Sequence, residues 1–283
     1  MIEATGIGGA RLPLVLLPGL LGAGIGSLVS IGMGSFTGLS RSAYALAPLS
    51  MPHFTRPDIA EFGWTIALAA VVAIVTRVII VSGLRTHGLV TRRMLVLLPL
   101  VGLVIAGLAI GFHQASGKSV NEVLFSGESA LPGLIAQAGT WSLSAIALLI
   151  VFKGIAYGLS LGSFRGGPTF PAIFLGAAAG IMASRLPGFA FSPAVAVGIG
   201  AAVAAVLRLP LSAVALATLL TSTAGTGDEP LIILGVVVSY LVTLVMSDVT
   251  SAETKSPTSD ATAPASPPGS RSSAPVAEGQ RAV

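Results

Sequence analysis

The chain has 283 residues, of which 53% are hydrophobic and 9% are charged, and its mean hydropathy is +0.92. Soluble domains carry about 25% charged residues, so this composition excludes a soluble globular protein and predicts an integral membrane protein. The net charge of +4 comes from basic residues scattered between apolar runs, which is typical of topology determinants and not of a nucleic-acid partner. The absence of cysteine excludes disulfides, thiolate catalysis and cysteine metal sites.

Eight apolar stretches follow one another between residues 12 and 247. A simple helical span of a membrane needs roughly 20 residues, and several of these stretches are shorter. The sequence therefore predicts an all-α polytopic membrane protein built from tilted and broken helices. The stretches lie at residues 12–32, 65–84, 94–112, 141–160, 169–184, 192–207, 209–221 and 231–247.

Two series of glycines lie inside apolar stretches. Small residues along a helix let helix backbones approach one another closely inside a membrane. We therefore predict that both series serve helix packing and not a ligand. The series are Gly19, Gly22, Gly24 and Gly26 in the first stretch, and Gly154, Gly158 and Gly162 in the fourth.

The polar segments set the orientation and the domain boundaries. Residues 84–93 form the most basic short loop, which is expected to face the cytoplasm. Residues 42–61 contain three prolines and several charges, and we interpret them as a loop or an interfacial segment. From Thr250 onward the sequence is rich in Ser, Thr, Ala and Pro. We therefore expect a membrane domain at residues 1–249 and a disordered tail at residues 250–283.

The most informative segment lies at residues 161–180 and reads LGSFRGGPTFPAIFLGAAAG. A glycine pair and two prolines break it between two apolar stretches. Irregular backbone is tolerated inside a membrane only where protein buries it or where it lines a cavity. We therefore interpret this break as a candidate transport site, with a helix that starts at Pro171.

A helix N-terminus suits an anion, because its unpaired N–H groups and positive dipole end attract negative charge without holding it too tightly. Pro168 and Pro171 have no N–H group and instead direct the turn and the helix start. Arg165 either raises the positive potential there or anchors the membrane interface, and we favour the second role. The backbone N–H groups predicted to bind the anion belong to Gly166, Gly167, Thr169 and Phe170.

Three segments carry a resemblance to a known family. They are residues 123–132 (VLFSGESALP), the apolar stretch around Lys153, and residues 166–176 (GGPTFPAIFLG). Together they resemble the C-terminal half of the CLC chloride channels and chloride/proton antiporters, over nearly all of residues 1–249. The resemblance implies one half of an inverted-repeat fold, a homodimer in membrane lipid, and transport of chloride or a similar small anion. It implies no enzymatic activity, no catalytic residue, no cofactor and no metal, and we expect the plasma membrane of a prokaryote.

The sequence departs from the family pattern at several positions. In the family the helix motif has the sequence Gly-x-Phe-x-Pro, whereas residues 167–171 have the sequence Gly-Pro-Thr-Phe-Pro. The two glycine-rich motifs of the family's N-terminal half, one of which carries a gating glutamate, do not occur in the sequence. Tyr240 lies inside the last apolar stretch, whereas the family's pore-lining tyrosine follows its last long span. By resemblance Glu3 is a candidate intracellular acid, but Ala4 occupies the position of the antiporters' proton-accepting glutamate. We therefore expect channel-like or gated permeation without proton coupling.

Two other hypotheses stay open. In the first, the chain is a truncated or structural membrane subunit that has no transport activity without a separate N-terminal half. An intramembrane serine protease would use a buried histidine such as His113, but no nucleophile motif accompanies it. The sequence also has no phosphate-binding loop and no His-Glu-x-x-His pair, so other enzyme classes are not expected.

Overall fold

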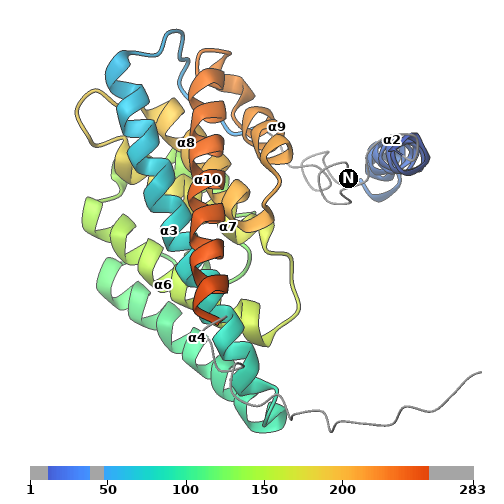
Figure 1. Ribbon diagram of the computed structural model, residues 1–283, viewed down its shortest axis with the longest axis vertical. Coiled ribbons are helices and arrows are strands. Elements are labelled where there is room, and N and C mark those ends of the chain that lie inside the picture. Colours follow the sequence, from blue (N-terminus) through green and yellow to red (C-terminus); the bar gives the residue numbers. More distant parts are fainter. Residues whose placement is uncertain (1–11, 39–47, 255–283) are drawn as a thin grey trace, which may run out of the picture. The chain divides into compact units, whose positions relative to one another are not determined.

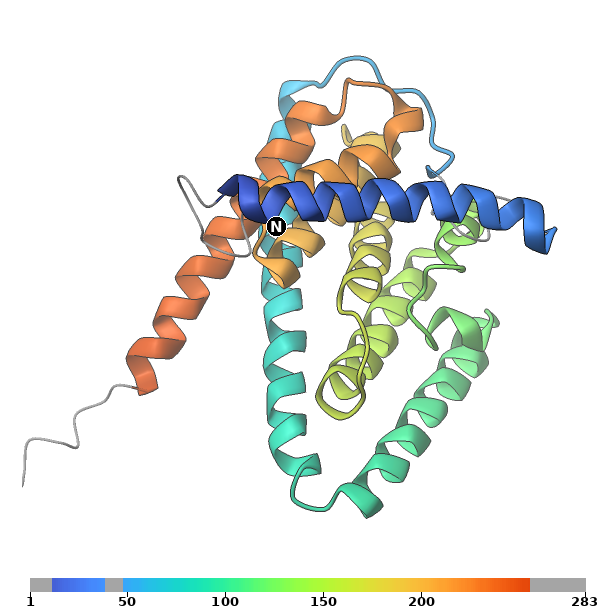
Figure 2. The ribbon, with the colours of Figure 1, turned by 90° about the vertical axis from the view of Figure 1, so that its right-hand side faces the viewer.

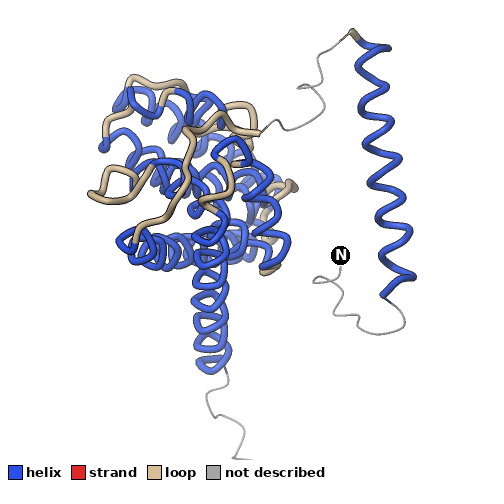
Figure 3. Tube along the Cα trace, turned by 90° about the horizontal axis from the view of Figure 1, so that it is seen from above, coloured by secondary structure: helices blue, strands red, loops and turns tan. Residues whose placement is uncertain are grey.

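The computed structural model describes residues 12–38 and 48–254. Within these ranges the regular structure is helical throughout, as Figure 3 shows by its blue tube and short tan loops. This result confirms the expected all-α polytopic fold. The α-helices, most of them labelled in Figure 1, are α2 (Leu12–Thr37), α3 (Ile59–Val90), α4 (Met94–Ser116), α5 (Leu131–Ala136), α6 (Leu143–Ser163), α7 (Thr169–Ala183), α8 (Phe191–Leu207), α9 (Pro210–Leu220) and α10 (Glu229–Thr254). The 3-10 helices are η3 (Val120–Glu122), η4 (Ala138–Thr140) and η5 (Ser222–Ala224).

Among the described residues, four helices are long and apolar enough to cross a membrane. They are α3, α4, α6 and the part of α10 that ends at Ser247. By contrast α7, α8 and α9 have only 15, 17 and 11 residues, as expected for short helices inside a membrane protein. Most of α8 is buried on every side, which is typical of a helix in the centre of a core.

Helix α3 is longer than the apolar stretch that predicted it. It starts at Ile59, where Asp58 and Glu61 form a capping box, so the expected loop at residues 42–61 ends before its last residues. It continues to Val90, so the expected basic loop at residues 84–93 is reduced to the turn at residues 91–93. Figure 2 shows α3 and α4 diverging from this turn. The last turns of α3 stay helical because they pack on α6, where His87 Nδ1 lies 3.1 Å from Gly162 O.

Glycines set how closely α3 and α6 pack. A Cβ atom on Gly83 would lie 3.1 Å from Gly158 O, and one on Gly162 would lie 2.9 Å from His87 N. The predicted packing role of the second glycine series is therefore confirmed. Around Gly22, Gly24 and Gly26 no atom of the described chain lies within 4 Å of the Cβ position, so their role stays a prediction.

The expected domain boundary and tail lie near the C-terminus, which the structure describes only in part. Helix α10 continues to Thr254 and crosses the boundary expected at residue 249. The rest of the predicted tail, residues 255–283, lies outside the described residues, and so does Glu3. The division into a membrane domain and a disordered tail stays a prediction.

Candidate functional site

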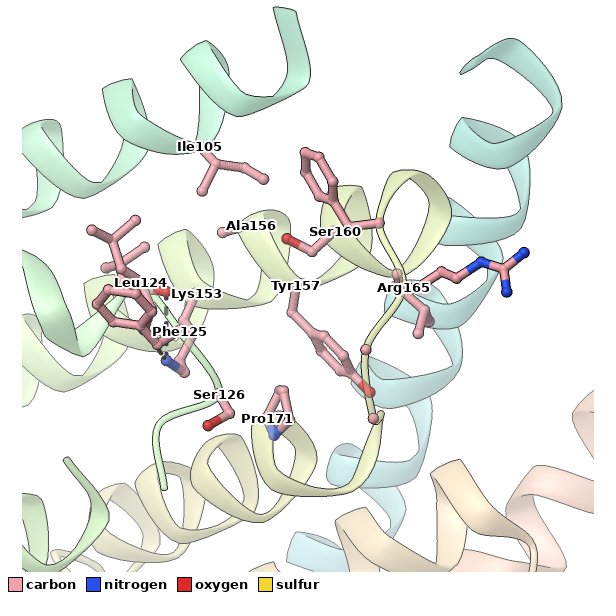
Figure 4. A pocket seen from close by; sticks show the side chains of 15 residues that line it. Ile105, Leu124, Phe125, Ser126, Lys153, Ala156, Tyr157, Ser160, Arg165 and Pro171 are labelled. Atoms are coloured by element: carbon pink, nitrogen blue, oxygen red, sulfur yellow. Dashed lines mark hydrogen bonds between the residues drawn. The ribbon is translucent and has the colours of Figure 1, made fainter. Parts of the chain in front are cut away.

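The break before α7 opens on a pocket of about 230 Å³, which we call the α7 pocket. Three parts of the chain line most of it: one face of α6, residues 123–126, and residues 164–167 with Pro171. Ile105 of α4 closes one side, as Figure 4 shows. Among the described residues, the lining includes no aspartate or glutamate. The pocket therefore combines backbone groups, hydroxyls and basic side chains, but no carboxylate.

The structure places the start of α7 at Thr169, so Pro171 lies in the first turn and Pro168 is the N-cap residue. No side chain caps this helix. The N–H groups of Thr169 and Phe170 have no partner in the preceding turn, as at every helix start. The helix therefore starts two residues before Pro171, the start that the sequence predicted, and its N-terminus with uncapped N–H groups faces the break.

The predicted binding residues divide into two groups. Gly166 and Gly167 line the α7 pocket and are exposed, and apart from their chain neighbours no atom of the described residues lies within 4 Å of their Cβ positions. Thr169 and Phe170 are not among the lining residues, and Phe170 packs against the largest hydrophobic core. The geometry therefore brings the glycine pair to the pocket, but not the two helical residues.

Tyr157 fixes the backbone at the start of α7. Its hydroxyl donates a hydrogen bond of 2.8 Å to the carbonyl oxygen of Pro168, and its ring lines the α7 pocket. Sequence reasoning missed this residue. A signal was present, because Lys153, Tyr157 and Ser160 recur at helical spacing and so share one face of α6.

Lys153 is the most buried charged group of the site, with 1% of its surface exposed. Its Nζ donates to the carbonyl oxygens of Glu122 at 2.7 Å, Leu124 at 3.4 Å and Val123 at 3.5 Å. The same Nζ lies 4.3 Å from the ring centroid of Phe174 in α7. This one side chain therefore connects α6, α7 and the segment that begins at η3.

The other ionisable residues singled out in the sequence lie less centrally. Arg165 lines the α7 pocket with its stem, but Figure 4 shows its guanidinium group pointing away from Lys153 and Tyr157. Glu128, in the segment VLFSGESALP, is exposed, and the N-cap residue of the following helix α5 is Ala130. His113 Nδ1 lies 2.7 Å from the carbonyl oxygen of Lys118.

The donor set of the α7 pocket suits an anion. Backbone N–H groups and serine hydroxyls are hydrogen-bond donors, and Lys153 adds positive charge although its own donors are used by carbonyl groups. Among the described residues, the lining carries no full negative charge that would repel an anion. Within the described part of the chain, no group of three or more His, Asp or Glu side chains lies close enough to hold a metal ion. The chemistry of the site therefore favours binding of a small anion.

Comparison with curated proteins and with solved structures finds no match. The family described as voltage gated chloride channel does match the sequence, over residues 7–244. This range covers most of the chain and every residue that lines the α7 pocket. The chain therefore belongs to the voltage-gated chloride channel family, and it is an integral membrane protein of a family that transports anions across membranes.

Proposed function

We propose that this chain moves chloride or a similar small anion through the α7 pocket by channel-like or gated permeation. The observation that carries the proposal is the glycine pair Gly166 and Gly167, which lies open to the pocket directly before an uncapped helix N-terminus. An anion can approach this backbone closely, because no Cβ atom stands in its way.

The same geometry favours release as well as binding. Conduction requires a site that attracts the ion but still lets it leave. Neutral N–H groups and a helix dipole supply partial positive charges instead of a full ion pair. The basic group nearest the break, Arg165, turns its guanidinium away from the pocket, in keeping with the interfacial role that we favour for it.

Passive permeation is the simpler mechanism for this site. Proton-coupled exchange needs a group that carries the proton beside the anion path, and among residues 12–38 and 48–254 no carboxylate lines the α7 pocket. We therefore propose movement of the anion down its electrochemical gradient, without a stoichiometric proton.

The test is chloride efflux from liposomes that contain only this purified chain, with potassium shunted by an ionophore and external pH recorded. Chloride efflux without proton movement supports the proposal. Stoichiometric proton movement would contradict passive permeation. No efflux from a folded and inserted chain would contradict transport by the chain alone, and would favour a subunit that needs a second protein.

We also propose that the chain forms a homodimer in the membrane, as the family resemblance implies. Exposed apolar side chains on α2, such as those of Leu20, Leu21 and Leu28, offer contact surface for lipid or for a second copy. Molar mass measured by light scattering in detergent tests this proposal, because a monomeric mass over a wide range of concentrations would contradict it.

A further inference from the structure

Lys153 is a buried cation in the middle of a helix that is apolar enough to cross a membrane. Charged side chains at such positions are costly, and they usually pair with an opposite charge or face a polar cavity. Lys153 does line a cavity, the α7 pocket. The question is which negative charge balances it.

Within the described residues, the protein balances this charge only in part. Lys153 Nζ binds three backbone carbonyl oxygens and lies over an aromatic ring, and no carboxylate oxygen approaches it within 4.0 Å. Glu122 is an acid whose charge acts on Lys153, and its backbone carbonyl oxygen accepts a hydrogen bond from Lys153 Nζ. Its Oε2 is buried and has no hydrogen-bond partner in the described part of the chain.

Glu122 is also shared between two lysines. Burial raises the pKa of its carboxyl group, while Lys153 and Lys118 both act to lower it. Two cations therefore face one acid, and the cluster carries a surplus of positive charge. A positive surplus beside the α7 pocket attracts an anion into it.

We infer that Lys153 supplies the fixed positive potential of the anion site, and that the transported anion is its missing counter-charge. This inference rests on the proposed function. The N–H donors of Lys153 are occupied by carbonyl groups, so the lysine acts on the anion through space and not as a direct ligand. It is therefore an electrostatic residue, whereas the glycine backbone makes the direct contacts.

If Lys153 had a purely structural role, its removal would lower the stability of the protein and not the affinity for the anion. Lys153 ties the segment after η3 to α6, and the ring of Phe174 that it covers also packs against Gly127, where a Cβ would lie 2.7 Å from the ring. Removal of such a clamp would lower stability. The test must therefore separate the charge of Lys153 from its hydrogen bonds.

Three variants make this separation. Lys153→Gln removes the charge but keeps an amide that donates to carbonyl oxygens, Lys153→Met removes both, and Lys153→Arg keeps the charge. The measurements are the chloride concentration at half-maximal flux in liposomes and the melting temperature in detergent. We expect Lys153→Gln and Lys153→Met to raise the half-saturating chloride concentration to a similar extent, on the order of tenfold. The half-saturating concentration of Lys153→Arg should stay near that of the original chain.

The outcomes distinguish this inference from the proposed function. If the original chain moves chloride and Lys153→Gln shows the same half-saturating concentration, Lys153 is only a clamp and the inference is overturned. If the original chain moves no anion, the proposed function fails and the inference fails with it. If Lys153→Met does not fold, the comparison of Lys153→Gln with Lys153→Arg still separates the charge from the structural role. Both variants keep hydrogen-bond donors, and only Lys153→Arg keeps the charge.

Discussion

The α7 pocket depends on two positions that carry no side chain. At Gly166 and Gly167 no atom of the described chain lies within 4 Å of the Cβ position, and neither residue has a left-handed φ angle. A larger residue therefore fits the backbone there without a clash. It would, however, place atoms in the space that the anion needs.

Gly167→Val is therefore expected to abolish anion flux while the fold is kept. The valine methyl groups would stand between the anion and the N–H groups before α7. Chloride efflux from liposomes measures the loss, and an unchanged melting temperature in detergent shows that the fold survives.

The matched control is Gly63→Val in α3, because Gly63 is also exposed, has no atom within 4 Å of its Cβ position and lies outside the α7 pocket. This control should leave flux unchanged. Normal flux through Gly167→Val would remove residue 167 from the anion path.

Asp228 is a second buried charge, and it lies in the loop before α10. Its surface is 1% exposed, and its Oδ2 has no hydrogen-bond partner among the described residues. Burial and the neighbouring Glu229 raise the pKa of its carboxyl group, although hydrogen bonds from the backbone and from Thr221 oppose this shift. The folded protein therefore favours the protonated form of this acid.

The pH dependence of stability follows from this shift. Because the folded-state pKa is raised, the favourable contribution of Asp228 is fully present below its unfolded-state pKa and is lost as the pH rises through the folded-state pKa. Asp228→Asn mimics the protonated form and keeps a good N-cap residue. We therefore expect a higher melting temperature for Asp228→Asn than for the original chain at neutral pH, and a difference that shrinks as the solution is acidified.

Glu128→Gln serves as the control for the loss of one negative charge, because Glu128 is exposed. It should not change the melting temperature at any of these pH values. A lower melting temperature for Asp228→Asn at neutral pH would show that the ionised carboxylate stabilises the fold.

At the scale of the elements, the contact between α7 and α8 holds the α7 N-terminus in place. The two helices approach so closely that a Cβ on Gly176 would collide with the carbonyl oxygen of Gly198 and would lie 2.8 Å from Ala202 Cβ. Gly180 meets α8 in the same way, with a Cβ position 2.5 Å from Val195 Cα. Glycine permits this close approach of two helix backbones.

Gly176→Ala is expected to destabilise the protein by about 1–3 kcal/mol, because the extra methyl group must push α7 and α8 apart. Thermal or denaturant unfolding in detergent measures this change. Gly133→Ala is the matched control, because Gly133 also lies in a helix, α5, and has no atom within 4 Å of its Cβ position. Equal stability of the two variants would show that α7 and α8 adjust without cost.

The helices themselves could largely be predicted from the sequence. The apolar stretches at residues 94–112, 169–184 and 209–221 correspond to α4, α7 and α9 within a few residues, because apolar content over such windows is a local property. The extra turns of α3 could not be predicted in this way. His87 and the polar residues around it are helical because α6 packs against them, and this contact is not visible in the local sequence.

The α7 pocket was predicted only in part, because contacts between distant parts of the chain are not visible in the local sequence. The glycine pair and the helix start are encoded in one short segment, so the sequence pointed to the glycine pair and placed the helix start within two residues of Thr169, where α7 begins. Tyr157 and the contacts of Lys153 with residues 122–124 join elements that lie far apart in the chain. Only the fold brings these groups to one cavity.

At the scale of the whole molecule, the distribution of basic residues in the sequence predicts the orientation in the membrane. Arg85, Arg92 and Arg93 cluster near the turn between α3 and α4, and basic residues next to a span favour the cytoplasmic side. Helix α4 has 23 residues, which at about 1.5 Å per residue exceed the hydrocarbon thickness of about 30 Å. The two ends of α4 should therefore lie on opposite sides of the membrane.

The absence of cysteine makes this expectation simple to test, because each introduced cysteine is the only thiol in the chain. Thr91→Cys and Ala115→Cys place one thiol near each end of α4, at exposed positions. In intact cells, a membrane-impermeant maleimide should label the cysteine at position 115 and should reach position 91 only after permeabilisation. Labelling of both in intact cells would mean that α4 does not cross the membrane. The reverse pattern would keep α4 as a span and invert the orientation, so the basic turn would not be the determinant of topology.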